Sequence, residues 1–270
     1  MDIMVTPYEQ DNIIAFVAHR VCVEIHKHHC FQVLLSLTEP FTSTIQGVAH
    51  NSRGLIINQS VAYSCHAAES NTLVYFIDPE SRIGGYLKQV LDGQVFARID
   101  HLWKPECCSG WSAVTAGNHA GEFPQLPAGL AREALRQVLA DDLFQRVVSR
   151  DERIVRAIAW IEASLQQRIS LQDVADYICL SPEYARHLFT QETGVSFSQF
   201  LLWKRIKHAI ALTVGDGQSL TNAALASGFT DQAHFCRLFK RTFGIPARGL
   251  LKKAHYGFQG LGKKSAEDND

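Results

Sequence analysis

The chain has 270 residues, of which 46% are hydrophobic, and its formal net charge is −1. This length suits two domains of ordinary size, and the composition can supply hydrophobic cores. No run of about 18 apolar residues predicts a membrane span, and the first ten residues lack the basic and apolar blocks of a signal peptide. Seven cysteines are an odd number for a disulfide framework, so we expect reduced thiols and a cytoplasmic protein.

The small net charge hides an asymmetry between the two halves. Residues 1–150 carry 11 Lys and Arg against 15 Asp and Glu, a net charge of −4. Residues 151–257 carry 13 against 9, a net charge of +4. A polyanionic partner would therefore meet the C-terminal half, although an excess of this size does not by itself establish nucleic-acid binding.

Short runs of β-branched and aromatic residues, separated by Gly, Asn and Ser clusters, fill residues 13–77. This is the pattern of a small β-sandwich or barrel. Helices are expected next, at residues 82–92 and 128–148. The Gly- and Pro-rich stretch 117–129 predicts a loop. We place the domain boundary at residues 149–151, where a new amphipathic helix begins.

The segment from His26 to Gln32 is the chemically distinctive part of the N-terminal half. His26 and His28 alternate onto one face of a strand, where two imidazoles can share a metal ion. Cys65 and His66 can supply further ligands, and imidazole with one thiolate suits zinc, nickel, cobalt or copper. The alternative is that these histidines line a pocket for a small-molecule effector or lie exposed at a strand end.

Two vicinal cysteines, Cys107 and Cys108, lie in a region rich in turn residues. Such a pair can coordinate soft metals or respond to oxidants. Cysteines are also common as small apolar residues, and we favour that interpretation here.

The C-terminal half opens with three amphipathic helices. The first spans residues 151–166, Ser170 caps the second, and Ser181 followed by Pro182 is a strong start signal for the third. The second and third helices predict a helix-turn-helix. The face of the third helix that points away from its apolar stripe carries Glu183, Arg186, His187 and Thr190.

A long amphipathic helix with Lys204, Arg205 and Lys207 is expected next, within residues 196–217. Residues 219–243 then repeat the earlier pattern, with a short helix, a break at Gly228 and a second helix with one buried apolar stripe. The opposite face of this last helix carries Gln232, Ala233, Arg237 and Lys240. The chain therefore contains two helix-turn-helix units.

The segment ASGFTDQAHFCRLFKRTFGIP, residues 226–246, resembles the signature of the AraC/XylS-type transcription regulators. The signature positions are filled by Ala226, Gly228, Phe229, Asp231, Phe235, Arg237, Phe239, Lys240, Gly244 and Pro246. A match over this many spaced positions is far more specific than a lone helix-turn-helix. The resemblance covers residues 151–254 in detail and residues 13–148 in outline.

This resemblance implies an α+β chain with three parts. Residues 1–150 would form a cupin-like β-barrel with flanking helices that binds an effector and contributes to a dimer. Residues 151–257 would form an all-α DNA-binding domain of two helix-turn-helix units joined by a long helix, and residues 258–270 a disordered tail. The cupin metal motif has a Glu where this chain has Gln32. Gln is a poor ligand for transition metals, which argues against an oxygenase-type site.

The resemblance further implies binding to double-stranded DNA in two successive major-groove segments, about 34 Å apart. The residues expected to read bases are Glu183, Arg186, His187, Gln232, Ala233 and Arg237. The residues expected to contact phosphates are Lys204, Arg205, Lys240 and Arg241. RNA polymerase and a second copy of the chain are the other expected partners, and the effector is a metal ion or a small molecule.

Enzymatic function is the alternative from another class. A cupin-type metal enzyme fused to a DNA-binding module would use His26, His28 and His66 around a metal. Two complete DNA-reading units favour a regulator, so we expect no catalytic residues. A repair regulator that transfers alkyl groups to a cysteine needs a Pro-Cys-His-Arg-type segment, which this sequence lacks.

Overall fold

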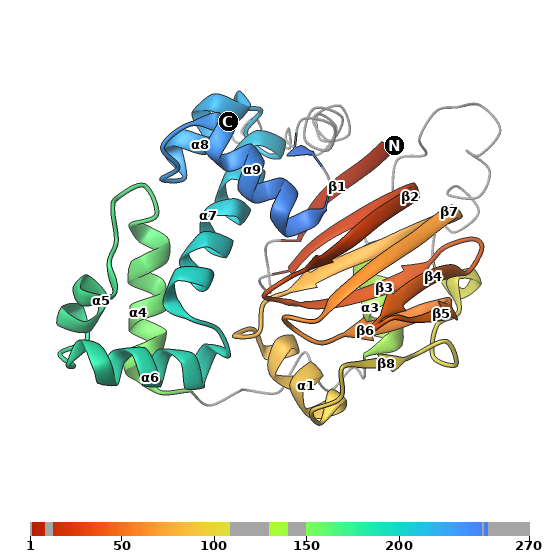
Figure 1. Cartoon of the computed structure of the whole chain (residues 1–270), viewed down its shortest axis with the longest axis horizontal. Coiled ribbons are helices and arrows are strands. Elements are labelled where there is room, and N and C mark those ends of the chain that lie inside the picture. The colour runs from red at the N-terminus through yellow and green to blue at the C-terminus, as the bar shows by residue number, and fades with distance from the viewer. Residues whose placement is uncertain (1, 9–12, 109–129, 140–149, 245, 248–270) are drawn as a thin grey trace, which may run out of the picture.

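The computed structural model describes residues 2–8, 13–108, 130–139, 150–244 and 246–247. It is an α+β structure with a nearly closed antiparallel β-barrel in the N-terminal half and a bundle of helices in the C-terminal half (Figure 1). The predicted fold class is therefore confirmed. Within the described residues, no helix is both long and apolar enough to cross a membrane.

Eight strands of the barrel are described: β1 (Asp2–Tyr8), β2 (Ile13–Lys27), β3 (Phe31–Ser36), β4 (Phe41–Ile45), β5 (Val48–Ser52), β6 (Gly54–Ile57), β7 (Ala62–Ile77) and β8 (Phe96–Arg98). Their order is β1-β2-β7-β3-β6-β8, and β4 pairs with both β5 and β7. The long strand β7 has two partners on one side, because residues 72–77 pair with β3 and residues 63–66 pair with β4. This exchange of partners bends the sheet over itself.

Burial on both faces explains why β3 is apolar along most of its length. Phe31, Val33 and Leu35 face a core that also contains residues of α1 (Arg82–Leu91) and α3 (Leu130–Val138). Leu34 points the other way, into the smaller core between β3, β4, β6 and β7. Such alternation follows from the two-residue period of a strand. The predicted helix at 82–92 is α1. Only α3 is described of the helix predicted at 128–148, and the predicted loop at 117–129 lies outside the described residues.

Six helices are described in the C-terminal half: α4 (Glu152–Ala163), α5 (Leu171–Tyr177), α6 (Pro182–Thr193), α7 (Phe197–Val214), α8 (Leu220–Ala226) and α9 (Gln232–Phe243). Each begins after a Ser or Asp whose side chain accepts a hydrogen bond from a backbone N–H of the first turn. This contact satisfies a donor that the helix itself leaves unpaired. Ser170 and Ser181 cap α5 and α6 as predicted, and Asp231 caps α9.

Two helix-turn-helix units result, and we call α5 with α6 unit 1 and α8 with α9 unit 2. Both turns use a residue in the left-handed region, Cys179 at φ 56° and Gly228 at φ 77°. In each turn the next residue donates its backbone N–H five residues back, from Leu180 to Ala175 at 2.9 Å and from Phe229 to Ala224 at 3.1 Å. The shared hydrogen-bond pattern is a Schellman-type helix ending.

The long helix α7 lies between the two units and belongs to two cores. Its first turns, with Phe197 and Phe200, join the unit 1 core, which is completed by α4, α5 and α6. Its later turns join a second core that we call the shared core, because strand residues of the barrel contribute to it. The shared core contains Ile14, Ala18, Cys30, Phe76, Trp203, Ile206, Ala209, Ile210, Val214, Ala224, Phe229, Phe235, Phe239, Phe243 and Ala247. The predicted boundary at 149–151 lies just before α4, and the predicted tail at 258–270 lies outside the described residues.

Candidate nucleic-acid interface

Helix α6 presents a polar face to solvent because its apolar residues pack in the unit 1 core on the opposite side. Ala185, Leu188 and Phe189 are buried on one side of the helix. The residues predicted to read bases from unit 1 are all exposed on the other side: Glu183, Arg186 and His187. Their side chains are therefore free to reach a ligand that approaches this face.

Helix α9 is organised in the same way, with Phe235, Phe239 and Phe243 buried. Ala233 and Arg237 are exposed, whereas Gln232 is half-buried and its Oε1 accepts a hydrogen bond of 2.7 Å from Oγ1 of Thr221. The hydrogen bond ties the start of α9 to α8 and orients the Gln232 amide. Lys240 and Arg241 are exposed in the last turn.

The guanidinium of Arg205 bonds to backbone carbonyls of the protein and does not extend freely into solvent. Its Nε donates to the carbonyl of Leu165 at 3.2 Å, and its Nη2 donates to the carbonyl of Gln167 at 2.7 Å. The guanidinium therefore ties α7 to the segment between α4 and α5. Partial burial lowers the pKa of Arg205 from its ordinary value.

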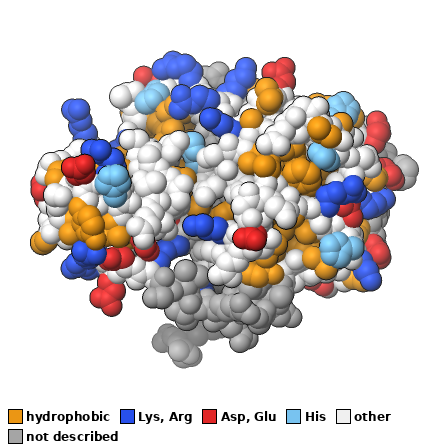
Figure 2. All heavy atoms as spheres, turned by 60° about the horizontal axis from the view of Figure 1, so that its bottom comes forward, with side chains coloured by type: hydrophobic (Ala, Val, Ile, Leu, Met, Phe, Trp, Pro, Cys, Tyr) orange, Lys and Arg blue, Asp and Glu red, His pale blue; other side chains and the backbone are white. Residues whose placement is uncertain are grey.

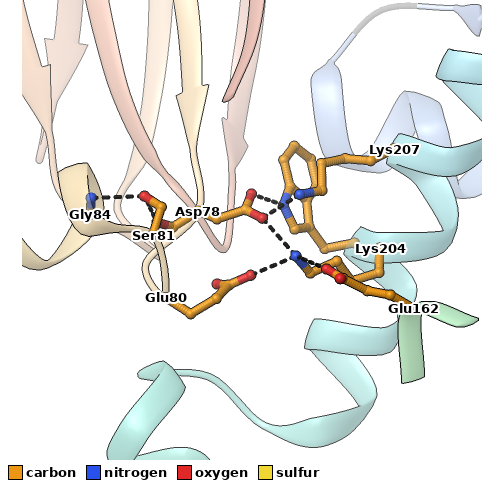
Figure 3. A network of polar contacts seen from close by, with 8 residues as sticks. Asp78, Glu80, Ser81, Gly84, Glu162, Lys204 and Lys207 are labelled. Atoms are coloured by element: carbon orange, nitrogen blue, oxygen red, sulfur yellow. Dashed lines mark hydrogen bonds and ion pairs between the residues drawn. The ribbon is translucent and has the colours of Figure 1, made fainter. Parts of the chain in front are cut away.

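Lys204 was predicted to contact phosphate, but only 3% of its side chain is exposed, so it does not face solvent here. Its Nζ lies 3.0 Å from Oδ2 of Asp78, 2.9 Å from Oε1 of Glu80 and 2.8 Å from Oε1 of Glu162 (Figure 3). The structure thus corrects the prediction. Lys204 joins the barrel to the helical half, and the helical periodicity of α7 did not reveal which face the barrel covers.

Asp78 is the centre of this interdomain network, and it is fully buried at the end of β7. Its Oδ1 accepts a hydrogen bond of 2.5 Å from Nε1 of Trp203, and its Oδ2 accepts from both Lys204 and Lys207. Although burial alone would raise the pKa of Asp78, the charges of Lys207 and Lys204 hold it well below the usual range. Burial and the charge of Asp78 raise the pKa of Glu80 to about 7.

The turn that carries the two carboxylates is fixed by the start of α1. Oγ of Ser81 accepts from the backbone N–H of Gly84 at 2.9 Å and donates to the carbonyl of Asp78 at 2.7 Å (Figure 3). Sequence reasoning missed this network. Acidic residues just after a strand and lysines three apart on a helix are present in the sequence, but 126 residues separate Asp78 from Lys204.

The four predicted metal ligands are not brought together. His66 is exposed with its Nδ1 3.2 Å from Sγ of Cys22, whereas the half-buried Cys65 lies opposite Val23, so its side chain takes the other face of β7. The rings of His26 and His28 do lie together, with centroids 4.7 Å apart. Among the described residues, no group of three or more His, Cys, Asp or Glu can hold a metal ion.

His28 and Gln32 are instead buried polar residues next to the shared core. His28 is 1% exposed, and its ring lies 4.7 Å from that of Phe76 and 5.8 Å from that of Phe243. Burial lowers the pKa of His28 well below its ordinary value. Within the part of the chain that the structure describes, neither ring nitrogen of His28 nor Oε1 of the buried Gln32 has a hydrogen-bond partner.

The vicinal cysteines differ in environment, because Cys107 is exposed and Cys108 is buried. Burial raises the pKa of Cys108 to about 11, so that thiol stays protonated near neutral pH. Cys108 packs in the barrel core with Trp103 and Leu135. This packing agrees with a small apolar role for Cys108.

Basic and acidic side chains are interspersed over the helical half on the face that Figure 2 shows. No single basic patch dominates that face, in line with the modest charge of +4 for residues 151–257.

The comparisons with known proteins match the helical half most closely. A family model described as a helix-turn-helix domain matches residues 174–253. The regulatory protein PocR of Salmonella typhimurium is 30% identical over 95 residues, which are 35% of this chain and 31% of PocR. The transcriptional activator RhaS of Escherichia fergusonii is 29% identical over 157 residues, which are 58% of this chain and 52% of RhaS. The chain thus spans between about a third and a half of these relatives.

A solved structure extends the similarity to both halves. An apo form of ToxT from Vibrio cholerae superposes with a TM-score of 0.55 over 90% of this chain and 98% of its own, at 12% identity. At this identity the superposition shows a common fold, with barrel and helices in one chain. The matched family model identifies residues 174–253 of this chain as a helix-turn-helix domain.

Proposed function

We propose that this protein is a sequence-specific, effector-responsive transcription regulator that reads two successive major-groove segments of double-stranded DNA. One observation carries the proposal. Two capped recognition helices, α6 and α9, keep their polar faces exposed while α7 holds both in one domain. A helix of this kind fits the major groove, and two in one chain need no palindromic site.

Base reading is assigned by donor and acceptor chemistry. Arg186 and Arg237 suit guanine through paired N–H donors, Gln232 suits adenine, and Glu183 accepts from the cytosine amino group. His187 contacts a base or a phosphate. Ala233 is exposed at the first turn of α9 and offers only a methyl group, so in unit 2 discrimination depends mainly on Arg237.

Phosphate contacts are assigned to Lys240 and Arg241, which are exposed at the end of α9. Contacts of this kind add affinity and orientation but little sequence preference. Lys204 and Arg205 are left out of this set, because their charged groups already have protein partners. Since DNA is the ligand, the protein would act in the cytoplasm. Because RhaS is named as a transcriptional activator, RNA polymerase is the proposed second partner. A homodimer is the proposed assembly.

For the effector we propose a small polar molecule that binds near His28 and Gln32. Their buried polar atoms lack partners among the described residues, and such atoms are costly to leave unpaired. The ring of His28 lies against those of Phe76 and Phe243, which join the barrel to α9, and Gln32 is the strand partner of Phe76. A ligand here can bias DNA binding only if it binds two states of the protein with different affinity.

The DNA-binding proposal is tested by selecting sites from random DNA with the full chain and then measuring variant affinities. Arg186→Ala should lose about 1–3 kcal/mol on the selected site and relax preference at one base pair. Lys240→Ala should weaken all sequences alike and reduce the salt slope by about 1. Lys88→Ala, an exposed lysine of α1, is the matched control and should change neither quantity. Equal losses on all sequences for Arg186→Ala would remove its base-reading role.

The effector proposal is tested by a thermal-shift screen with monosaccharides, carboxylic acids and amines as probes. A probe that raises the unfolding temperature should also change affinity for the selected DNA. Both effects should vanish in Gln32→Leu, which keeps the side-chain size and removes the unpaired oxygen. A probe that acts equally on wild type and on Gln32→Leu would place the effector elsewhere.

A further inference from the structure

The barrel contacts the two helix-turn-helix units in different ways. Its residues Ile14, Ala18, Cys30 and Phe76 are part of the shared core, together with residues of α7, α8 and α9. In the part of the chain that the structure describes, the unit 1 core draws its members from residues 154–201 and none from the barrel. Figure 1 shows the same arrangement, with α9 next to β1 and β2 and with α5 remote from the strands.

Backbone and side chain both take part in the contact between α9 and the barrel. Gly244, at φ 70°, ends the helix, and a Cβ added there would lie 2.5 Å from Cγ1 of Val23 and 3.4 Å from Cγ of His26. The preceding Phe243 is 4% exposed, and its ring meets that of Phe76 edge to face with centroids 5.0 Å apart. A packed contact of this kind transmits a shift of the strand directly to the helix.

Unit 1 has a looser equivalent of this contact. Gly194 ends α6 at φ 76°, and a Cβ added there would lie 2.9 Å from Nε2 of Gln59, in the loop between β6 and β7. Gln59 is a half-buried, flexible side chain, so it can move aside without moving a strand. The two matched helix ends therefore meet the barrel with different stiffness.

Asp78 binds α7 where the helix passes from the unit 1 core to the shared core. Trp203, Lys204 and Lys207 all donate to Asp78, whereas Phe197 and Phe200 lie earlier in the helix and pack in the unit 1 core. The later turns of α7 are thereby fixed to the barrel together with α9. Unit 1 is linked to the barrel through the first turns of α7 and through Glu162 of α4, whose carboxylate bonds Nζ of Lys204. The Glu162 side chain is 42% exposed, so this second link is weaker than the buried contacts of Asp78.

We propose that the barrel controls DNA reading through unit 2, while unit 1 reads its half of the site independently of the barrel's state. The inference rests on the proposed function and adds which unit is regulated. A ligand that shifts β2 or β7 would move α9 through Val23 and Phe76, and would change the contribution of the base pairs that face α9. Base pairs that face α6 would contribute the same in both states.

A first test needs no DNA and uses hydrogen–deuterium exchange in the full chain. Val23→Asp places a carboxylate against the carbonyl end of α9, and Gln59→Ala removes the contact of unit 1. Val23→Asp should speed exchange in α9 at least tenfold and leave α6 within twofold. Gln59→Ala should leave both helices within twofold. Equal acceleration of α6 and α9, or none in α9, would overturn the inference.

If Val23→Asp does not fold, Val23→Ala provides the same comparison with a smaller effect. Hydrogen–deuterium exchange should then speed at least threefold in α9 and stay unchanged in α6. The second test uses the DNA selected with wild type, mutated in the half that depends on Arg186 or in the half that depends on Arg237. Val23→Ala should alter the penalty for the Arg237 half at least threefold and leave the other penalty unchanged.

Failure of this inference and failure of the proposed function give different results. Wild type that selects no DNA sequence would refute the proposed function, and the exchange experiment would still decide whether the barrel is coupled to α9 alone. Equal changes in both half-site penalties would overturn the inference while DNA reading stands.

Discussion

Unit 1 and unit 2 share one backbone plan, but their turns lie in different surroundings. The turn of unit 1 is made by Cys179, whose side chain is exposed. The turn of unit 2 is made by Gly228, where an added Cβ would lie 2.4 Å from the carbonyl oxygen of Leu165 and 2.8 Å from Nε of Arg205. The turn of unit 2 is thus enclosed by the segment after α4 and by α7, and its helices also pack on the barrel, whereas the turn of unit 1 is open to solvent at Cys179. The two turns therefore share a backbone geometry but differ in how closely other parts of the protein surround them.

Removing the carboxylate at position 78 should have the largest effect on this difference. Asp78→Asn keeps the shape but leaves Lys204 and Lys207 with less charge compensation in a buried site. We expect the free energy of unfolding to fall by about 3–5 kcal/mol, measured by chemical denaturation. Asp216→Asn, at an exposed carboxylate, is the control and should stay within about 0.5 kcal/mol. Equal small losses in the two variants would show that the network does not join the halves.

The pKa of Glu80 gives a pH dependence to the same contact. Its pKa is raised from 4.5 to about 7 in the folded protein, with Asp78, Lys204 and Lys207 as its charged neighbours. A carboxyl with a raised pKa contributes its full stability below about 4.5 and loses it as the pH rises through 7. Between pH 5 and pH 8 the free energy of unfolding should fall by on the order of 2 kcal/mol.

The matched variant for this experiment is Glu80→Gln, which cannot ionise and should flatten the stability profile over the same pH range. Lowering the pH below 6.5 should act in the opposite direction through His28, because burial holds the pKa of that imidazole low. A profile unchanged by Glu80→Gln would assign the pH dependence to other groups.

The turn of unit 2 should tolerate no side chain. Gly228→Ala adds a methyl group against a backbone carbonyl and imposes a left-handed conformation on alanine. We expect a loss of about 2 kcal/mol or more in the unfolding free energy. Gly93→Ala is a suitable control, because Gly93 also has a positive φ but has no neighbour within 4 Å of the added Cβ. If both variants lost the same amount, the enclosure of unit 2 would contribute nothing.

A substitution in the turn of unit 1 should raise the free energy of unfolding, and by the smallest amount of the changes considered. Cys179 is held at φ 56°, a conformation that glycine adopts without the steric cost of a Cβ. Cys179→Gly should therefore raise the unfolding free energy by about 1 kcal/mol, measured by thermal unfolding. A loss of stability would mean that the thiol makes a contact that its exposure does not indicate.

Sequence patterns predicted the helical half well because its signals are local. A cap such as Ser181, a glycine such as Gly228 and an apolar stripe each act within one or two turns, and all were present in the sequence. The strands of the barrel were predicted in outline by β-branched runs. The exchange of partners along β7 could not be predicted, because it joins residues far apart in the chain.

The site was predicted less completely for the same physical reason. Arg186 and Arg237 follow from their place on an amphipathic helix, and they are exposed as expected. Lys204 lies on the same kind of helix, but a basic residue looks alike in a sequence whether DNA or a buried carboxylate faces it. Its burial is decided by Asp78, and Cys65 and His66 were separated because consecutive residues of β7 take opposite faces of the strand.

The shared core also limits how far the two halves of this protein are interchangeable modules. Fusing this barrel to the helical half of another protein of this fold would leave Asp78 in an apolar setting unless the new partner supplied an indole and two ammonium groups in register. Fusing this helical half to the barrel of another protein would expose Phe243 and Trp203 as a hydrophobic patch. We therefore expect recombination between proteins of this fold to be productive only when the strand end carrying Asp78 and the helix carrying Trp203 are inherited together.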